Sequence, residues 1–363
     1  MTALTLVRPL PRLSLRVTGW AFGTAGAVAS LAMPYVLVPT PVLRLVVAVL
    51  VALQIRLVFA LPAMVVRGVA WLRSRRVHAV VCVVVLAAAP LVAASSAPPY
   101  SSAGADFLGG VTSADRIAQV TGAPAVTPIR AYASLTDATT DAARAAAAVD
   151  QLRRTGGFAR ATILVAAPTG SGWVDPAAVA TMEYLTGGNV AAVAAQYADR
   201  PSWMEYLLGT GPAERSAAAL VTALRSAIDA LPAGARPRLV LYGESLGAIA
   251  AAGVASAADA TLLAGLPGGA GRPAPAHTTS IVNADDPVGY WSPSLLVAPD
   301  GPGAWVPIVT FWQVTGSLPG AQDVPVGHGH RYGGALAQGF VDAGAVAPPG
   351  PGEIAAIART IDL

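Results

Sequence analysis

The sequence contains no lysine and a single cysteine. All 23 basic residues are arginines, and Cys82 lies inside an apolar run. A lone cysteine excludes a disulfide framework and a thiolate metal site, and we expect it to be a small buried apolar side chain. The absence of lysine excludes the Gly-Lys-Ser/Thr sequence of a phosphate-binding loop. We expect no cofactor and no metal.

Charge is also scarce. Only 12% of the 363 residues are charged and 54% are hydrophobic, with a net charge of +3. This charge is too small, and lies too much near the N-terminus, to favour nucleic acid as a partner. The composition is too apolar for an ordinary soluble enzyme, and the length suggests about two domains.

Three long apolar runs occupy the first 97 residues, at 18–38, 42–66 and 77–94. Each is about as long as the ~20 residues that a helix needs to cross a bilayer. We therefore expect a transmembrane helical region over residues 1–97, followed by a linker or loop at 98–130. A cleaved signal peptide fits poorly, because no small-x-small cleavage site follows the first run and two more apolar runs come next.

The arginines indicate how this region is oriented. They precede the first run and fill the second loop, at Arg8, Arg12, Arg16, Arg67, Arg73, Arg75 and Arg76. The positive-inside bias places both segments in the cytoplasm. With three crossings, we expect a multi-pass protein of the cell membrane whose C-terminal domain is extracytoplasmic.

Residues 131–363 alternate short apolar strands with helices. This alternation is typical of an α/β fold with a doubly wound, mostly parallel sheet covered on both faces. Ligands of such sheets bind at the C-terminal ends of the strands. We expect strands at 162–167, 189–197, 238–242, 261–264, 278–283 and 307–314, and helices at 137–153, from after Pro176 to about 185, at 213–230 and at 333–343.

The motif Gly243-Glu-Ser-Leu-Gly247 lies between an expected strand and an Ala-rich helical pattern. In that context G-x-S-x-G predicts a nucleophile elbow that presents Ser245. Side chains in place of its glycines would collide with the neighbouring strand and helix. The alternative is a Gly-rich turn that carries an incidental serine.

A serine nucleophile needs a base and a carboxylate that orients the base. His328 and His330, half of the four histidines, follow the last expected strand. Either could be the base, and the sequence does not separate them. Surface loop residues and a two-histidine metal site are the alternatives; the second ranks low because no acidic cluster lies nearby.

The carboxylate is expected between the serine and the histidines in chain order. Asp286, which directly precedes Pro287 at the end of an expected strand, is our choice, with Asp285 in reserve and Asp323 as a weaker candidate. An Asp-Pro turn is the plain structural alternative.

Two backbone N–H groups should stabilise an oxyanion. Leu246, next after the serine, can supply one of them. A loop rich in glycine, which lets the backbone approach a ligand closely, can supply the other from Thr169 or Gly170.

Taken together, several motifs resemble the actinobacterial membrane-anchored alpha/beta-hydrolase family, whose members carry a multi-helix membrane domain before a serine-hydrolase domain. The resemblance spans roughly residues 160–345 and implies the same roles for Ser245, Asp286 and the Gly-His-Gly-His histidines. The chain departs in having three apolar runs where four are expected, and a fourth crossing would reverse the side of the C-terminal domain. The motifs are Pro168-Thr-Gly-Ser-Gly-Trp-Val-Asp-Pro, Gln196-Tyr with Pro201-Ser-Trp, Tyr242-Gly-Glu-Ser-Leu-Gly, Asp286-Pro-Val-Gly-Tyr-Trp-Ser-Pro and Asp323-Val-Pro-Val-Gly-His-Gly-His-Arg-Tyr.

We therefore expect a membrane-anchored serine hydrolase that cleaves an ester, thioester or similar acyl bond through an acyl-enzyme. Its expected partners are a small-molecule or lipid-like acyl substrate and the lipid bilayer. Two alternatives remain: an acyltransferase or cyclase with the same triad, and a non-catalytic hydrolase-like membrane scaffold.

Overall fold

The computed structural model describes residues 102–202, 205–206, 209–268, 276–296, 305–306 and 308–363, and before them only residues 49, 52 and 53. The chain divides into two compact units. One comprises Ala97–Tyr290 with Ala321–Leu363, and the other comprises Met1–Ser96 with Trp291–Gly320. The first unit holds the sheet and every candidate site residue, and it is described by itself below.

A six-stranded sheet forms the centre of this unit, in the order β1-β3-β2-β4-β5-β6. Every neighbouring pair is parallel, which confirms the expected parallel sheet. β2, β3 and β5 are buried along their whole length, as apolar strands covered on both faces should be. The strands are β1 Ile129–Ala133, β2 Thr162–Ala167, β3 Val190–Ala195, β4 Arg238–Glu244, β5 Ala260–Ala264 and β6 Thr278–Ile281.

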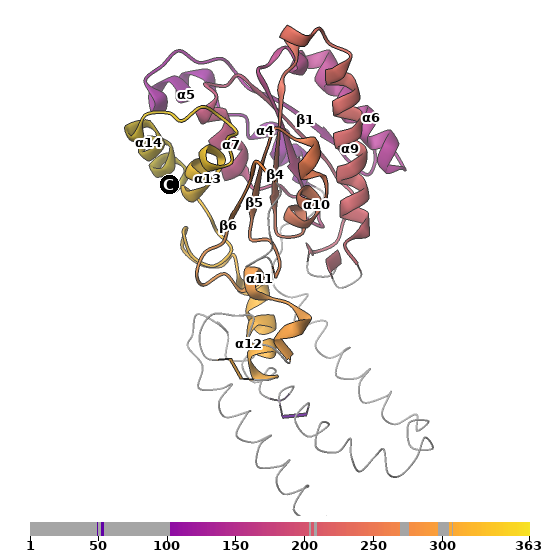
Figure 1. Cartoon of the computed structure of the whole chain (residues 1–363), viewed down its shortest axis with the longest axis vertical. Coiled ribbons are helices and arrows are strands. Elements are labelled where there is room, and N and C mark those ends of the chain that lie inside the picture. The colour runs from indigo at the N-terminus through magenta and orange to yellow at the C-terminus, as the bar shows by residue number, and fades with distance from the viewer. Residues whose placement is uncertain are drawn as a thin grey trace, which may run out of the picture. The chain divides into compact units, whose positions relative to one another are not determined.

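Helices cover both faces of the sheet (Figure 1). On one face α6 Asp141–Thr155, α9 Gly211–Asp229 and α10 Leu246–Val254 pack through one apolar cluster. On the other face α4 Ala103–Gly109, α7 Pro176–Leu185 and α13 Ala335–Asp342 contribute to a second cluster. Helices α5 Ala114–Thr121 and α14 Pro351–Ile361 pack with α7. The architecture is therefore doubly wound, as expected.

Local sequence signals explain where these helices begin and end. Thr140 caps α6, since its hydroxyl accepts a hydrogen bond from the N–H of Ala143. Asp175 caps α7 and is followed by proline at the first helical position. Gly156 ends α6 in the left-handed conformation, which glycine adopts without the steric cost that other residues incur.

The segment at 98–130, described from residue 102, is not the linker that the sequence predicts. It contains α4 and α5, and the edge strand β1 begins at Ile129. The Pro-, Ser- and Gly-rich start of this segment obscured the helices, although Ser113 caps α5 and Gly122 ends it. Strand β1 lacked an apolar run because its second residue is Arg130.

The strand expected at 307–314 is also wrong: helix α12, Val309–Ser317, lies there, in the other unit. A short apolar run rich in β-branched and aromatic residues reads as a strand, but periodicity alone does not separate it from a helix. The hydroxyls of Thr315 and Ser317 donate to carbonyls four residues back, a helical arrangement. The same unit contains η5 Pro293–Leu296 and η6 Leu318–Gly320, whereas α11 Pro287–Tyr290 belongs to the first unit.

The membrane region stays a prediction. Among the residues that the structure describes, none of the helices has both the length and the apolar character needed to cross a bilayer. The apolar runs at 18–38, 42–66 and 77–94 lie outside the described residues, except for Val49, Ala52 and Leu53, which are helical.

A buried ion pair joins the edge strand to the helical layer. Arg130 Nε of β1 lies 2.7 Å from Glu183 Oε1 of α7, and the two side chains are 2% and 0% exposed. Arg130 Nη1 also donates to the carbonyl of Phe107 in α4, and Glu183 Oε2 accepts from the N–H of Thr112. This pair therefore fixes residues 103–112 onto the sheet.

We expect Glu183→Gln to lower the free energy of unfolding by about 3 kcal/mol, because it leaves the buried guanidinium without a countercharge. Urea unfolding followed by circular dichroism measures the change. The matched control is Asp150→Asn, which breaks an exposed pair with Arg153 and should change the value by less than about 0.5 kcal/mol. Equal effects of the two substitutions would contradict the role given to Glu183.

Candidate active site

Ser245 occupies a tight turn between β4 and α10. Its φ and ψ are 56° and −121°, a strained conformation for a residue other than glycine, of the kind that clusters at functional sites. A Cβ at Gly243 would lie 2.2 Å from the carbonyl oxygen of Gly247, and a Cβ at Gly247 would lie 2.2 Å from that of Ala167. Both glycines are therefore sterically required, as expected of an elbow.

His330 and Asp286 meet at the C-terminal edge of the sheet. His330 Nδ1 lies 2.8 Å from Asp286 Oδ2, and the two side chains are 4% and 0% exposed. Asp286 also accepts hydrogen bonds from the N–H of Val288 and from the hydroxyl of Tyr332. A proton on Nδ1 satisfies this arrangement and leaves Nε2 as the basic nitrogen.

A second Asp–His pair, which is more exposed, contacts the same histidine-containing loop. His328 Nδ1 lies 3.1 Å from Asp285 Oδ2, and the His328 side chain is 63% exposed. Asp285 Oδ1 accepts from the N–H of Gly329, while Asn283 donates its side-chain amide to the carbonyls of Gly329 and Arg331. The two histidines that the sequence left open therefore occupy different places, since only His330 is buried with a carboxylate. The weaker candidate acid, Asp323, is exposed.

His330 lies beside the elbow without a hydrogen bond to Ser245. The Ser245 N–H donates to the carbonyl of Ala264, and the imidazole lies over the next residue, Gly265, where a Cβ would come 2.2 Å from His330 Cε1. Among the described residues, Nε2 of His330 has no hydrogen-bond partner. It lies 3.5 Å from Glu244 Oε1.

The expected oxyanion donors differ in availability. The N–H of Leu246 is the first of helix α10, so it has no intrahelical acceptor. The N–H of Thr169 donates to the carbonyl of Trp173, and that of Gly170 donates to Ser202 Oγ. If Thr169 or Gly170 is to supply the second donor, its present hydrogen bond must therefore break.

Sequence reasoning missed two carboxyl groups near His330, the buried Glu244 and the partly buried Asp175. Glu244 is the variable residue of the elbow motif itself; its Oε2 accepts from Tyr242 and its Oε1 from the side-chain amide of Gln322. Asp175, the N-cap of α7, lies close enough to Glu244 for the two carboxyl groups to shift each other's pKa. An acidic residue at the end of an apolar strand was the one available signal for Glu244.

These groups shift one another's ionisation. Burial raises the pKa of Glu244 to about 8, with a further contribution from the charge of Asp175. Burial likewise raises the pKa of Asp175 to about 6. Burial alone would lower the pKa of His330, but its hydrogen bond to Asp286 and the charges of Glu244, Asp286 and Asp175 raise it overall.

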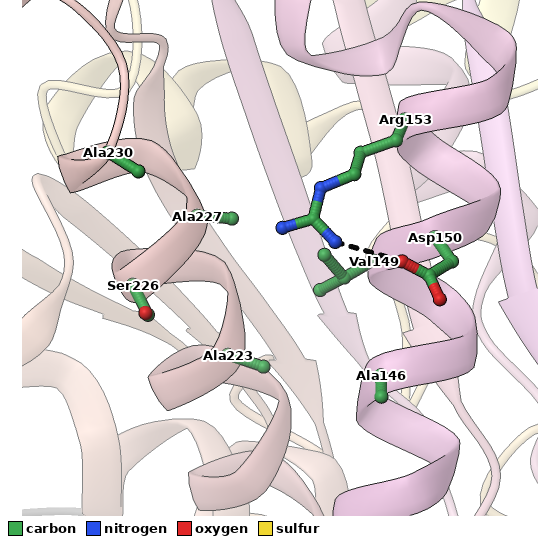
Figure 2. A pocket seen from close by; sticks show the side chains of 8 residues that line it. All are labelled: Ala146, Val149, Asp150, Arg153, Ala223, Ser226, Ala227 and Ala230. Carbon is green, nitrogen blue, oxygen red and sulfur yellow. Dashed lines mark hydrogen bonds and ion pairs between the residues drawn. The ribbon is translucent and has the colours of Figure 1, made fainter.

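Neither a metal-ion cluster nor a second hollow offers an alternative site among the described residues. Within the described part of the chain, His, Cys, Asp and Glu side chains form no group of three or more that could hold a metal ion. A hollow between α6 and α9 shares no residue with the cluster around Ser245 (Figure 2). Its charged side chains, Asp150 and Arg153, pair with each other. It offers no nucleophile–base arrangement.

Because Glu244 keeps its proton in the folded chain up to about pH 8 and in the unfolded chain only to about pH 4.5, stability should fall as the pH rises between these values. Between pH 5 and pH 8 we expect the free energy of unfolding of the native protein to fall by about 3 kcal/mol more than that of Glu244→Gln. Urea titrations at both pH values measure this difference. An identical pH dependence in the two proteins would count against a buried, protonated Glu244.

Comparisons with known proteins identify the family of this chain. The model of the alpha/beta-hydrolase family matches residues 129–270 and 272–351, more than half of the chain. Among solved structures, Trichoderma reesei cutinase in complex with a C11Y4 phosphonate inhibitor is 15% identical, covers 51% of this chain and 90% of its own, and has a TM-score of 0.30. A search of curated proteins found no match. The matched ranges include the six parallel strands, the elbow and the histidine loop, and the chain therefore belongs to the alpha/beta-hydrolase family.

Proposed function

We propose that this protein is a membrane-anchored serine hydrolase that cleaves an acyl ester-type bond through an acyl-enzyme. One observation carries the proposal: a buried hydrogen bond of 2.8 Å between His330 Nδ1 and Asp286 Oδ2, at the sheet edge where a strained turn presents Ser245. A nucleophile, a base and the acid that orients the base are the parts that acyl transfer to serine requires.

In the proposed reaction Ser245 Oγ attacks the acyl carbon while His330 Nε2 takes the hydroxyl proton. Asp286 holds the imidazole in the required tautomer and stabilises the imidazolium that forms. The N–H of Leu246 donates to the developing oxyanion, with a second donor from the Thr169–Gly170 loop. Nε2–H then protonates the leaving group, and water repeats the sequence to release the acid.

The missing hydrogen bond between Ser245 and His330 has a physical explanation within this proposal. Catalytic hydrogen bonds are often long in free enzymes and tighten when substrate binds. Because Asp286 and Tyr332 hold the Nδ1 side of the ring, a side-chain rotation of Ser245 is the smaller movement that would close the contact.

Anchoring and location belong to the same proposal. The three apolar runs, at 18–38, 42–66 and 77–94, support a membrane anchor, and the arginine distribution supports an extracytoplasmic catalytic domain. An enzyme held at a bilayer favours an apolar acyl substrate. The sequence motifs also support a place in the actinobacterial membrane-anchored branch of the family.

We expect a fluorophosphonate probe to label the full-length protein covalently and Ser245→Ala to abolish the labelling, because the probe reacts only with an activated serine. Gel fluorescence and intact mass measure the adduct. Ser216→Ala, which removes a buried serine of α9 far from the elbow in sequence, is the control and should label normally. An unlabelled native protein that is folded and unmodified would overturn the proposed activity.

The two Asp–His pairs allow a second test. We expect His330→Gln and Asp286→Asn to lower kcat/KM for a p-nitrophenyl ester by at least about a thousandfold, since each removes part of the base system. His328→Gln and Asp285→Asn alter the exposed pair and should cost less than about tenfold. If His328→Gln proved as damaging as His330→Gln, the assignment of the base would be wrong.

A further inference from the structure

The glycine-rich turn at residues 169–173 lies beside the nucleophile elbow. A Cβ at Gly247, in the first turn of α10, would lie 2.2 Å from the carbonyl oxygen of Ala167 and 3.2 Å from that of Pro168. The residue that precedes the turn therefore packs against the same helix end that carries the N–H of Leu246. A displacement of the turn would change its distance from the nucleophile.

The turn closes on itself through two backbone hydrogen bonds. The N–H of Gly172 donates to the carbonyl of Thr169 at 3.0 Å, and the N–H of Thr169 donates to the carbonyl of Trp173 at 2.8 Å. Gly172 has a φ of 84°, as the last residue of a three-residue hairpin loop commonly does. The carbonyls of Ser171 and Gly172 take no part in this closure, so partners outside the turn must satisfy them.

Two buried side chains from other strands bind these carbonyls. Tyr132, in β1, donates its hydroxyl to the carbonyl of Gly172 at 2.8 Å. Gln196, directly after β3, donates Nε2 to the carbonyl of Ser171 at 3.2 Å. A Cβ at Gly172 would lie 2.5 Å from the Tyr132 hydroxyl oxygen and 2.8 Å from Cγ of Gln196. The turn is therefore packed directly on both side chains.

Both side chains are themselves fixed. Tyr132 is 6% exposed and its ring lies 5.7 Å from that of Phe107. Burial raises the pKa of Tyr132, so its hydroxyl keeps the proton that it donates. Gln196 is 9% exposed; its Nε2 also donates to the carbonyl of Ala198, and its Oε1 accepts from the N–H of Leu135. The position of the turn is therefore set by β1 and by the end of β3.

We propose that Tyr132 and Gln196 are positioning residues for oxyanion stabilisation: by binding two carbonyls of the 169–173 turn, they hold it at the distance from Ser245 at which one of its N–H groups can meet the oxyanion. This inference rests on the proposed function, because an oxyanion forms only if Ser245 attacks an acyl carbon. Neither side chain contacts the substrate in this proposal.

The proposed role concerns the chemical step and not the binding of substrate. The oxyanion develops only in the transition state, so a displaced donor lowers kcat and leaves KM nearly unchanged. Loss of a whole oxyanion donor costs about a hundredfold or more in kcat. Removing one of the two side-chain contacts displaces the turn without removing the donor, so the loss should be smaller.

The first test is steady-state kinetics of the full-length protein with a p-nitrophenyl ester. We expect Tyr132→Phe, which removes only the hydroxyl, to lower kcat about tenfold and to change KM by less than about twofold. Gln196→Met, which keeps the side-chain length but has no donor, should act in the same way. Tyr184→Phe is the matched control and should keep both constants, since Tyr184 is 5% exposed but belongs to a different apolar cluster.

A second measurement separates positioning from a general loss of structure. In a thiono ester, sulfur replaces the carbonyl oxygen and accepts hydrogen bonds more weakly, so the native protein should cleave the ordinary ester faster than its thiono analogue. In Tyr132→Phe this rate ratio should fall, because less oxyanion stabilisation remains to be lost. A smaller fraction of folded protein would lower both rates equally and leave the ratio unchanged.

The outcomes separate the inference from the proposed function. An unchanged kcat, a change confined to KM, or an unchanged ratio of the two esters in the folded variants overturns the positioning role. A native protein that does not react with a fluorophosphonate overturns the proposed function instead. If circular dichroism shows that Gln196→Met does not fold, Tyr132→Phe decides by the same two measurements.

Discussion

The hydrogen bond between Asp286 and His330 is the interaction on which the site depends. A carboxylate with no exposed surface is stable only when hydrogen bonds replace its lost water, and here His330, Tyr332 and the N–H of Val288 replace it. Each of these donors must reach the same edge of the sheet. The loop after β6 and the histidine loop are therefore fixed relative to each other by the charge they enclose.

The elbow presents a different constraint, which is steric. Ser245 adopts a positive φ, and the close contacts at Gly243 and Gly247 leave no room for a Cβ at either position. The surrounding sheet must compensate for this strain. It does so through β2 and β5, which pair with β4 on either side as far as Gly243 and Glu244, directly before the turn.

The apolar core next to the elbow contains several polar groups, which is unusual at the centre of a parallel sheet. Tyr242 and Tyr332 belong to an apolar cluster with Phe340 and Leu262, yet their hydroxyls face Glu244 and Asp286. Strongly shifted carboxyl pKa values of this kind concentrate at functional sites. The arrangement keeps acids buried at the point where proton transfer is proposed, and the tyrosine rings exclude water from it.

Much of the fold was readable from local patterns. Strand β2 was predicted with the bounds that the structure has, and helix α7 with nearly the same bounds, because both are marked by strong local signals. Strand β1 was not predicted, since its arginine is acceptable only because Glu183 lies opposite it. Helix α12 was mistaken for a strand because β-branched propensity is weak against tertiary context.

The sequence by itself determined the parallel α/β class, the elbow and its serine, and the chain order of serine, acid and histidine, because each depends on local spacing. Only the tertiary structure separated His330 from His328, and it placed the preferred Asp286, not the reserve Asp285, beside the buried histidine. It did so because burial, which differs completely between the two pairs, arises from how distant segments pack. For the same reason Glu244 and Asp175, 69 residues apart in the chain, came close to His330 only once the sheet had brought β2 and β4 side by side.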